Sequence, residues 1–225
     1  GMGILILAVA VLPLLGVGGS QLFKAEAAGP LKETKLTPRM TGTAKGLWGV
    51  CALFSVACAL AYWLGGMAPL DAVMHMFTTV SLGGLSPYDA SFGHFQSPLL
   101  EAIAVVFMLV ASCNFALYFV AFRKGDWRGF WRDPELRATL GTLIVGGLVV
   151  SLLLWAKGVY EPLTALRHGM FNVVSLATTT GYATVDYLGW PVFAPVLVLL
   201  LSGVATSAGS TGCGIKIVRM LILVK

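Results

Sequence analysis

Two stretches of the sequence, Met67-Ala-Pro-Leu-Asp-Ala-Val-Met-His75 and Tyr160-Glu-Pro-Leu-Thr-Ala-Leu-Arg-His168, share the pattern Pro-Leu-x-Ala-aliphatic-x-His. Met-Phe follows each histidine closely, and a stretch rich in Ser and Thr then leads to a glycine, which we align as Gly83 in the first copy and Gly181 in the second. Agreement over this length indicates an internal repeat. The repeat predicts two structurally equivalent segments, and what surrounds them decides the fold.

Apolar segments surround both copies of the repeat. Hydrophobic residues make up 57% of the 225 residues and charged residues 11%, whereas an ordinary globular domain carries about 25% charged residues. Five segments contain no Asp, Glu, Lys or Arg: 1–23, 46–70, 102–122, 138–156 and 187–215. Each has at least the roughly 18 residues that a helix needs to cross a bilayer. The composition predicts an all-α integral membrane protein and excludes a soluble domain.

Each copy of the repeat is too short to cross the membrane and then return as extended chain. Pro69 and Pro162 suit the first turn of a helix, where a missing N–H costs nothing. Non-helical backbone at membrane depth survives only when it is buried in protein or lines a water-filled cavity. We therefore predict re-entrant half-helices, each followed by a pore loop, in repeated helix–pore-loop–helix units of the potassium-channel-like type.

This interpretation divides the chain into five parts. They are the closing helix of a preceding pore unit (1–20), a linker (21–46), a complete unit with its filter near 81–86 (47–122), a second linker (123–138) and a further unit with its filter near 178–183 (139–225). Within the two units we expect spanning helices at 47–64, 98–122, 139–156 and from 190 onward.

Basic residues are concentrated in the two linkers and at the C-terminal end, although the net charge is only +5. Cytoplasmic loops of membrane proteins are enriched in Lys and Arg, so we place the linkers inside, with the pore loops opening outward. This sorting sets nucleic-acid binding aside. On the outer side, Asp89 and Asp186 are expected either to raise the cation concentration at the pore mouth or to cap the loops after each filter.

Glycine at the turning point of each hairpin permits backbone conformations in which carbonyl oxygens replace the hydration shell of an ion. The C-terminal end of each half-helix directs partial negative charge to the same place, which favours a cation. The stretch at 179–183 resembles the Thr-Val-Gly-Tyr-Gly filter of potassium channels, with Ala183 in place of the last glycine. The predicted filter residues are Ser81, Leu82, Gly83, Gly84, Thr179, Thr180, Gly181 and Tyr182, and the carbonyls of Ser81, Leu82, Thr179 and Thr180 are expected to coordinate K⁺.

Other polar residues in the apolar segments are weaker candidates. Asn114 is expected either to face the cavity or to hydrogen-bond another helix. His75 and His168 occupy the same repeat position, where structural hydrogen bonding is favoured over a proton relay. The four cysteines lack CxxC spacing, which predicts neither a zinc site nor a disulfide framework. Three histidines without HExxH, and no nucleophile–base pair, argue against an enzyme.

Four stretches carry a resemblance to a known family: residues 1–19, 29–39, 83–93 and 208–216. Through them the sequence resembles the TrkH-type potassium uptake proteins of the Trk/Ktr/HKT superfamily. The resemblance implies four such units around one pore, of which this chain would hold the end of the first, all of the second and most of the third. It also implies a homodimer in membrane lipid, a cytosolic TrkA-type nucleotide-binding regulatory subunit, and no cofactor besides K⁺ as the transported ion.

The last apolar segment is interrupted at 202–214, where four glycines in thirteen residues cost a continuous helix roughly 1 kcal/mol each. The resemblance places a gating loop here, below the filter. A small-residue packing face is the alternative, whereas a phosphate cradle fails the Walker pattern. The predicted gating residues are Gly203, Gly209, Ser210, Thr211, Gly212, Gly214 and Lys216. Lys216 and Arg219 are expected either to contact the gate or to meet the cytoplasmic headgroups.

We therefore predict potassium uptake across the bacterial inner membrane through a gated, channel-like pore, with no covalent chemistry. A sodium or mixed-cation transporter of the same superfamily is the nearest alternative. In the family, glycine at the filter position favours potassium and serine favours sodium. A non-conducting membrane scaffold is a further alternative, and it predicts that Gly83 and Gly181 tolerate alanine.

Overall fold

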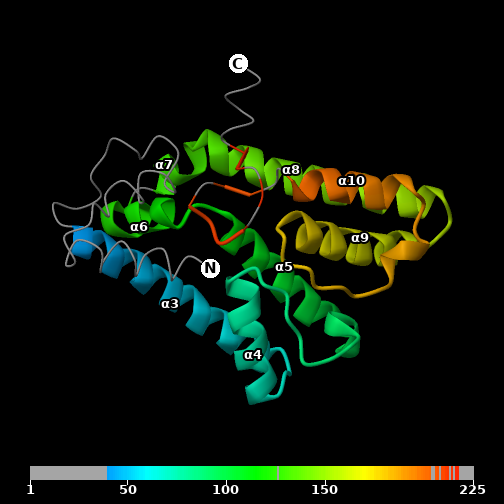
Figure 1. Ribbon diagram of the computed structural model, residues 1–225, viewed down its shortest axis with the longest axis horizontal. Helices are drawn as coiled ribbons and strands as arrows, with labels where there is room; N and C mark the ends of the chain where they lie inside the picture. Colours follow the sequence, from blue (N-terminus) through cyan, green and yellow to red (C-terminus); the bar gives the residue numbers. More distant parts are fainter. Residues whose placement is uncertain are drawn as a thin grey trace.

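The computed structural model (Figure 1) describes residues 40–125, 127–203, 206–207, 209–212, 214 and 216–217. Within these residues the regular structure is helical, apart from one isolated parallel bridge between Thr206 and Lys216. The expected closing helix at 1–20, most of the linker at 21–46 and Arg219 lie outside the described residues. The all-α fold predicted from composition is confirmed.

The helices follow one another in two similar groups. The first comprises α3 (Met40–Leu64), α4 (Pro69–Val80), η3 (Ser91–His94), α5 (Pro98–Ser112) and α6 (Phe115–Lys124). The short helix α7 (Trp127–Arg132) leads to the second group, α8 (Pro134–Ala156), α9 (Pro162–Ala177), η4 (Tyr187–Gly189) and α10 (Phe193–Ser202). Figure 1 shows α8 and α10 side by side along α9, with α3, α4 and α5 gathered on the opposite side.

The half-helices predicted from the repeat are α4 and α9. Each begins with proline in its first turn. Their 12 and 16 residues correspond to lengths of about 18 and 24 Å at 1.5 Å per residue, which are less than a hydrocarbon core of about 30 Å. Among the described residues, two helical segments are long and apolar enough to cross a membrane, Gly46–Leu64 within α3 and Pro134–Ala156, or three if the bent pair Pro98–Ser112 and Phe115–Arg123 is one span.

Two helices begin earlier than the charge-free segments suggest. Helix α3 begins at Met40, inside the expected linker, and α8 begins at Pro134 rather than near 139. At α8 the cause is local, because the Asp133 side chain accepts a hydrogen bond from the Leu136 amide at 2.8 Å and Pro134 occupies the first helical position. A charge-free stretch locates only the apolar part of a helix, whereas capping residues set its first turn.

The expected span at 98–122 is not one continuous helix. It is two helices, α5 and α6, bent by 88°, although no glycine or proline lies at the bend. The Asn114 side chain instead accepts a hydrogen bond from the Ala116 amide at 2.9 Å and starts a new helix. The carbonyls of Ala111 and Ser112 accept hydrogen bonds from the amides of Thr211 and Ser207, at 3.4 and 3.1 Å. The bend is therefore stabilised by chain that lies far away in the sequence.

One buried core joins the two groups of helices. It includes Tyr62, Met76, Phe92, Phe171 and Tyr182, which come from α3, α4, η3, α9 and the loop after α9. Residues from both copies of the repeat thus bury their side chains together, and neither copy packs as an independent unit.

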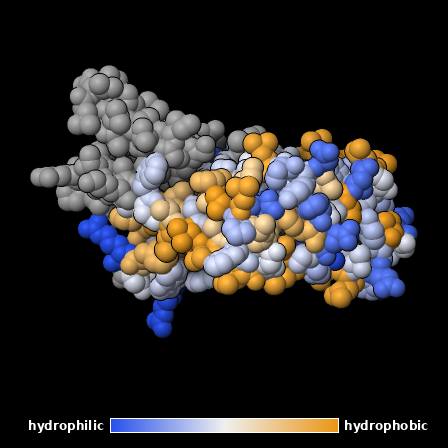
Figure 2. Space-filling model, turned by 90° about the horizontal axis from the view of Figure 1, so that it is seen from below, coloured by the Kyte–Doolittle hydropathy of each residue, from blue (hydrophilic) through white to orange (hydrophobic). Residues whose placement is uncertain are grey.

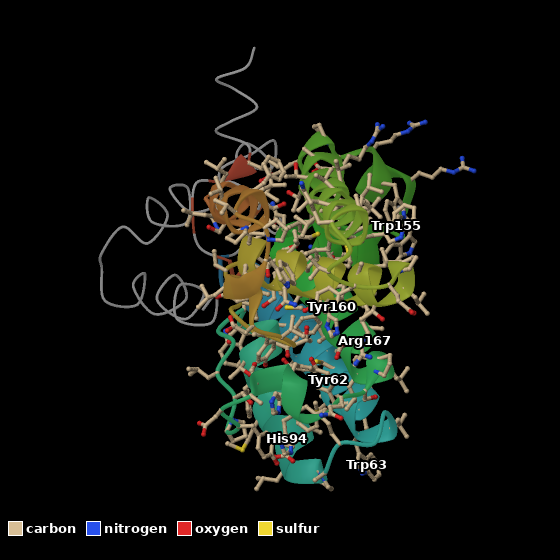
Figure 3. All side chains as sticks on the ribbon, turned by 90° about the vertical axis from the view of Figure 1, so that its right-hand side faces the viewer. Tyr62, Trp63, His94, Trp155, Tyr160 and Arg167 are labelled. Carbon is tan, nitrogen blue, oxygen red and sulfur yellow. The ribbon has the colours of Figure 1, made fainter. Side chains whose placement is uncertain are left out.

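The outer surface of the helices is apolar. Large hydrophobic side chains are exposed along α3, α8 and α10: Leu53, Val56, Leu60, Val145, Leu148, Leu152, Val196, Leu199 and Leu200. Figure 2 shows hydrophobic residues spread over the described part of one face. Trp63 and Trp155, at the C-terminal ends of α3 and α8, are also exposed (Figure 3). Apolar flanks ending in tryptophan suit a helix in lipid.

Candidate functional site

The two predicted filters have the same backbone hydrogen-bond pattern. After α4, the Thr78 carbonyl accepts hydrogen bonds from the amides of Gly83 and Gly84, at 2.8 and 3.3 Å. After α9, the Ser175 carbonyl accepts hydrogen bonds from Thr180 and Gly181, at 2.8 and 3.2 Å. The structural equivalent of Gly181 is therefore Gly84.

This register corrects the sequence alignment, which paired Gly181 with Gly83. The first copy has two adjacent glycines, and sequence similarity alone gave no reason to choose the second. The backbone angles agree with the corrected register, because Gly84 and Gly181 both have positive φ, 61° and 93°. Gly83 is not among the residues with positive φ.

The residues two positions earlier in each loop also have left-handed backbone. Leu82 has a φ of 52° and Thr179 a φ of 62°, and such conformations are unusual for residues with a Cβ, above all a β-branched one. Strain of this kind is worth about 1–3 kcal/mol per residue and persists only where the surroundings impose it. Its occurrence at the same place in both copies marks these loops as the candidate functional site.

The two loops are in direct contact. A Cβ built on Gly84 would lie 1.9 Å from the Thr180 carbonyl oxygen, so only glycine allows this approach. The predicted filter residues of both copies are therefore brought together, with Leu82, Tyr182 and Thr180 buried and Ser81, Gly83 and Gly181 exposed.

The side chain of Tyr182 joins the second filter to the first half-helix. Its hydroxyl is hydrogen-bonded to the hydroxyls of Thr78 and Thr79, the latter at 3.1 Å, and donates to the His75 carbonyl at 3.2 Å. The Tyr182 carbonyl accepts a hydrogen bond from the Ser175 hydroxyl at 2.7 Å. Sequence reasoning considered only the backbone of Tyr182. The sequence did contain two signals for this contact: a tyrosine directly after the filter glycine, and a Thr-Thr pair near the end of the other half-helix.

The histidines of the repeat hold the chain that leaves each filter. The ring of His75 is hydrogen-bonded through Nε2 to the Ser86 hydroxyl at 3.1 Å, and the ring of His168 through Nδ1 to the Thr184 hydroxyl at 2.9 Å. Both histidines thus bond a hydroxyl in the chain after a filter, although through different ring nitrogens. Among the described residues no group of three or more His, Cys, Asp or Glu side chains is arranged to hold a metal ion.

The two outer aspartates are both exposed, but they have different surroundings. The Asp186 side chain accepts a hydrogen bond from the Leu188 amide at 2.9 Å and caps η4, one of the two expected roles. Near Asp89, the Tyr88 hydroxyl donates to the Asp71 carboxylate at 2.9 Å, and this hydrogen bond raises the pKa of Tyr88 above its ordinary value.

The predicted gating residues lie directly behind the first filter. The Thr211 hydroxyl donates to the carbonyls of Val80 and Ala111, at 3.1 and 3.3 Å, and so joins the end of α4 to the end of α5. A Cβ on Gly212 would lie 3.3 Å from the Leu82 side chain. The Lys216 ammonium donates to the Gly212 carbonyl at 2.6 Å and closes the loop on itself.

The remaining gating residues form the ends of this loop. Gly203 terminates α10, and Gly214 approaches the Ser202 and Gly203 carbonyls with a φ of 95°. The Ser210 hydroxyl donates to the Ser207 carbonyl at 2.7 Å. The Gly209 carbonyl accepts from the Phe115 amide at 3.2 Å. The neighbouring Asn114 side chain caps its own helix, whereas facing the cavity or bonding another helix were the two roles expected.

A cavity of ≈ 380 Å³ lies on the open side of the second filter, between the end of α9 and α10. Its wall is mainly apolar and contains two filter residues, Thr179 and Gly181, together with Leu176, Tyr187, Trp190, Pro195, Val198, Leu199 and Ser202. The surface of the filter that faces away from the first copy is therefore accessible from this cavity.

Comparisons with known proteins agree with these observations. A family model described as TrkH, cation transport protein, matches residues 1–225. The Trk system potassium uptake protein TrkH of Salmonella typhimurium is 46% identical over 226 residues, covering 100% of this chain and 47% of that protein. The protein of the same name from Vibrio parahaemolyticus is 47% identical, covering 99% and 47%, and the Escherichia coli potassium uptake protein TrkG is 41% identical, covering 100% and 46%.

A solved structure gives the same result. The crystal structure of the potassium transporter TrkH from Vibrio parahaemolyticus superposes with a TM-score of 0.80 at 42% sequence identity, covering 99% of this chain and 45% of that one. The chain thus spans about half the length of the curated relatives it matches.

Proposed function

The chain belongs to the TrkH family of cation transport proteins, and we propose that it forms part of a gated pore for potassium uptake across the bacterial inner membrane. Its curated relatives are named potassium uptake proteins. Uptake would be driven by the membrane potential, which is worth about 2.3 kcal/mol per charge per 100 mV. The basic linkers would lie in the cytoplasm and the pore loops would open to the periplasm.

The observation that carries the proposal is the shared backbone of the two filter loops. Left-handed residues at every second position, 82 and 84 in one loop and 179 and 181 in the other, turn alternate peptide units over. Consecutive carbonyl oxygens can point to the same side only when the backbone alternates in this way. Carbonyls arranged so can replace the water around K⁺. In the corrected register, Thr179 and Thr180 correspond to Leu82 and Gly83. We therefore propose that the carbonyls of Leu82, Gly83, Thr179 and Thr180 coordinate K⁺, with Gly83 in place of the Ser81 expected from the sequence alignment.

The half-helices support a cation at this place. Helices α4 and α9 both end immediately before their filters, and the C-terminal end of a helix carries a partial negative charge of about half an electron. The two helix ends therefore favour K⁺ and disfavour an anion in the same volume. The family relationship also supports a homodimer in lipid and a TrkA-type regulatory subunit as partners.

The loop at 203–216 is the proposed gate. It is hydrogen-bonded to the last carbonyl of α4 and to the bend between α5 and α6, so a displacement of this loop would be transmitted to the inner end of the first filter. No continuous helix obstructs such a displacement, because α10 ends at Ser202.

The test uses the complete gene in a bacterium that lacks its own potassium uptake systems. We expect growth at limiting K⁺ to be restored by the natural protein and lost with Gly181→Ser, since serine at the filter favours sodium in the family and φ at this position is 93°. Uptake of ⁸⁶Rb⁺ and ²²Na⁺ should be measured for both proteins. Equal ⁸⁶Rb⁺ and ²²Na⁺ uptake by the natural protein would favour a mixed-cation transporter, and no uptake would favour a scaffold.

A further inference from the structure

Glu101 and Arg167 form a two-pronged ion pair between the two groups of helices. The Arg167 Nε donates to Glu101 Oε2 at 2.6 Å and its Nη2 donates to Oε1 at 2.7 Å. Glu101 belongs to α5 and Arg167 to α9, so the pair joins the first pore unit to the second. Figure 3 shows Arg167 in the middle of the molecule, where these two groups meet.

The pair is too buried to be an incidental surface contact. Only 4% of the Glu101 side chain is exposed, against 31% for Arg167. A buried carboxylate that loses its partner is strongly destabilising, and bidentate geometry holds both side chains in one orientation. The distance between α5 and α9 is therefore restrained at this point.

Helix α9 holds the chain after the second filter from one side. His168, next to Arg167, is hydrogen-bonded to the Thr184 hydroxyl. Asn172 donates to the same hydroxyl at 2.9 Å and accepts from the Thr184 amide at 3.3 Å. Thr184 thus has three hydrogen bonds to α9, within two turns of Arg167.

The segment before α5 holds the same chain from the other side. The Ala183 amide donates to the Ser91 hydroxyl at 3.3 Å, and the Ala183 carbonyl accepts from the Gly93 amide at 3.2 Å. A Cβ on Gly93 would lie 2.8 Å from the Thr184 carbonyl oxygen. Residues 183–184 are therefore enclosed between α9 and η3, and η3 leads directly into α5, which carries Glu101 in its first turn.

We propose that Glu101 and Arg167 are positioning residues for ion selectivity. By fixing α5 against α9 they hold residues 183–184, and with them the carbonyls of the filter at 179–182, at the spacing that suits K⁺. Neither side chain contacts the ion in this proposal. The inference rests on the proposed function, because selectivity is defined only for a conducting pore.

The test measures the ratio of ⁸⁶Rb⁺ to ²²Na⁺ uptake, per amount of protein in the membrane, for the full-length protein in the transport-deficient strain. The variants are Arg167→Lys, Arg167→Gln and the exchange Glu101→Arg with Arg167→Glu. Glu161→Gln is the matched control, since Glu161 is an exposed carboxylate on the same helix end whose side chain forms no capping hydrogen bond.

We expect Arg167→Gln to lower the ratio about tenfold. A tenfold change corresponds to about 1.4 kcal/mol, which is within the coupling energies found between residues in contact. Arg167→Lys should lower it less, because an ammonium keeps the charge but not the two-pronged geometry. The exchange should recover part of the lost ratio, and Glu161→Gln should leave it unchanged.

Other outcomes would overturn the inference. If Arg167→Lys is present in the membrane in natural amounts and keeps the natural ratio, the geometry of the pair does not set selectivity. If the variants lower ⁸⁶Rb⁺ and ²²Na⁺ uptake equally, the pair is only structural. If the proposed function is wrong, the result is different, because the natural protein itself would then fail to restore growth at limiting K⁺.

Discussion

The α-carbon of Gly84 in the first filter lies against the carbonyl oxygen of Thr180 in the second, so closely that an added methyl group would be 1.9 Å from that oxygen. The two loops come from different copies of the repeat, yet each restricts which side chains fit in the other. Changes at this contact should therefore affect both filters at once.

Gly84→Ala should abolish K⁺-limited growth, and Gly83→Ala should largely preserve it. At Gly84 the methyl group meets backbone, and the φ of 61° is costly for alanine by about 1 kcal/mol or more. At Gly83 the nearest atom is the Ser81 hydroxyl at 3.2 Å, which belongs to an exposed side chain. Growth curves of the full-length variants test this. Loss with Gly83→Ala and tolerance of Gly84→Ala would instead support the alignment made from sequence.

Tyr182→Phe should lower both thermal stability and the ⁸⁶Rb⁺ to ²²Na⁺ uptake ratio. The Tyr182 side chain is fully buried, and its hydroxyl bonds two threonines and a carbonyl of α4. Loss of a buried hydrogen bond is worth about 1 kcal/mol, and more where partners are left unsatisfied. Tyr187→Phe is the control, because the Tyr187 hydroxyl has no hydrogen bond within the described residues. Equal melting temperatures for the two variants would contradict the prediction.

Asp186→Asn should reduce K⁺ uptake at low ionic strength and have little effect at high ionic strength. Asparagine keeps an oxygen for the Leu188 amide but removes the charge. Salt screens the attraction between that charge and a cation, since the Debye length falls from about 30 Å at 0.01 M salt to about 10 Å at 0.1 M. Asp186→Ala also removes the cap and should add a loss that salt does not change. Asp89→Asn should follow the Asp186→Asn pattern. Salt-independent losses in both asparagine variants would exclude cation attraction.

Thr211→Val should increase the rate of K⁺ uptake if the loop at 203–216 is a gate. Valine fills the same space but cannot donate to the carbonyls of Val80 and Ala111, so the loop is held less firmly below the filter. Ser202→Ala is the control, because within the described part of the chain the Ser202 hydroxyl donates to the Leu199 carbonyl of its own helix, at 2.8 Å. Initial rates of ⁸⁶Rb⁺ uptake measure the effect, and a lower rate with Thr211→Val would indicate a packing role instead.

Much of the fold was predictable because its causes are local. Pro69 and Pro162 fix where the half-helices begin, and the apolar segments around them require a membrane. The end of α10 at Ser202 likewise follows from the glycines that come next. Each of these features depends on residues that are continuous in the chain, which a single sequence displays directly.

The details of the site were less accessible. The pairing of Gly84 with Gly181 follows from hydrogen bonds to Thr78 and Ser175, and sequence similarity favoured the neighbouring glycine. The bend after α5 lacks glycine and proline and depends on carbonyl partners in the distant loop at 207–211. The two differences have different origins. The register of each filter depends on hydrogen bonds to a carbonyl within the preceding half-helix, which residue identities do not display, whereas the bend depends on backbone partners that lie far away in the chain.

The sequence by itself determined that this protein is a repeated, re-entrant membrane protein with glycine in both predicted filters, because hydropathy, proline and glycine act on the residues beside them. Only the tertiary structure decided which glycine serves in the first filter, that the Tyr182 hydroxyl bonds the neighbouring half-helix, and that Glu101 meets Arg167. The last two contacts join residues that are 104 and 66 positions apart in the chain, and their geometry exists only once the two copies have packed together.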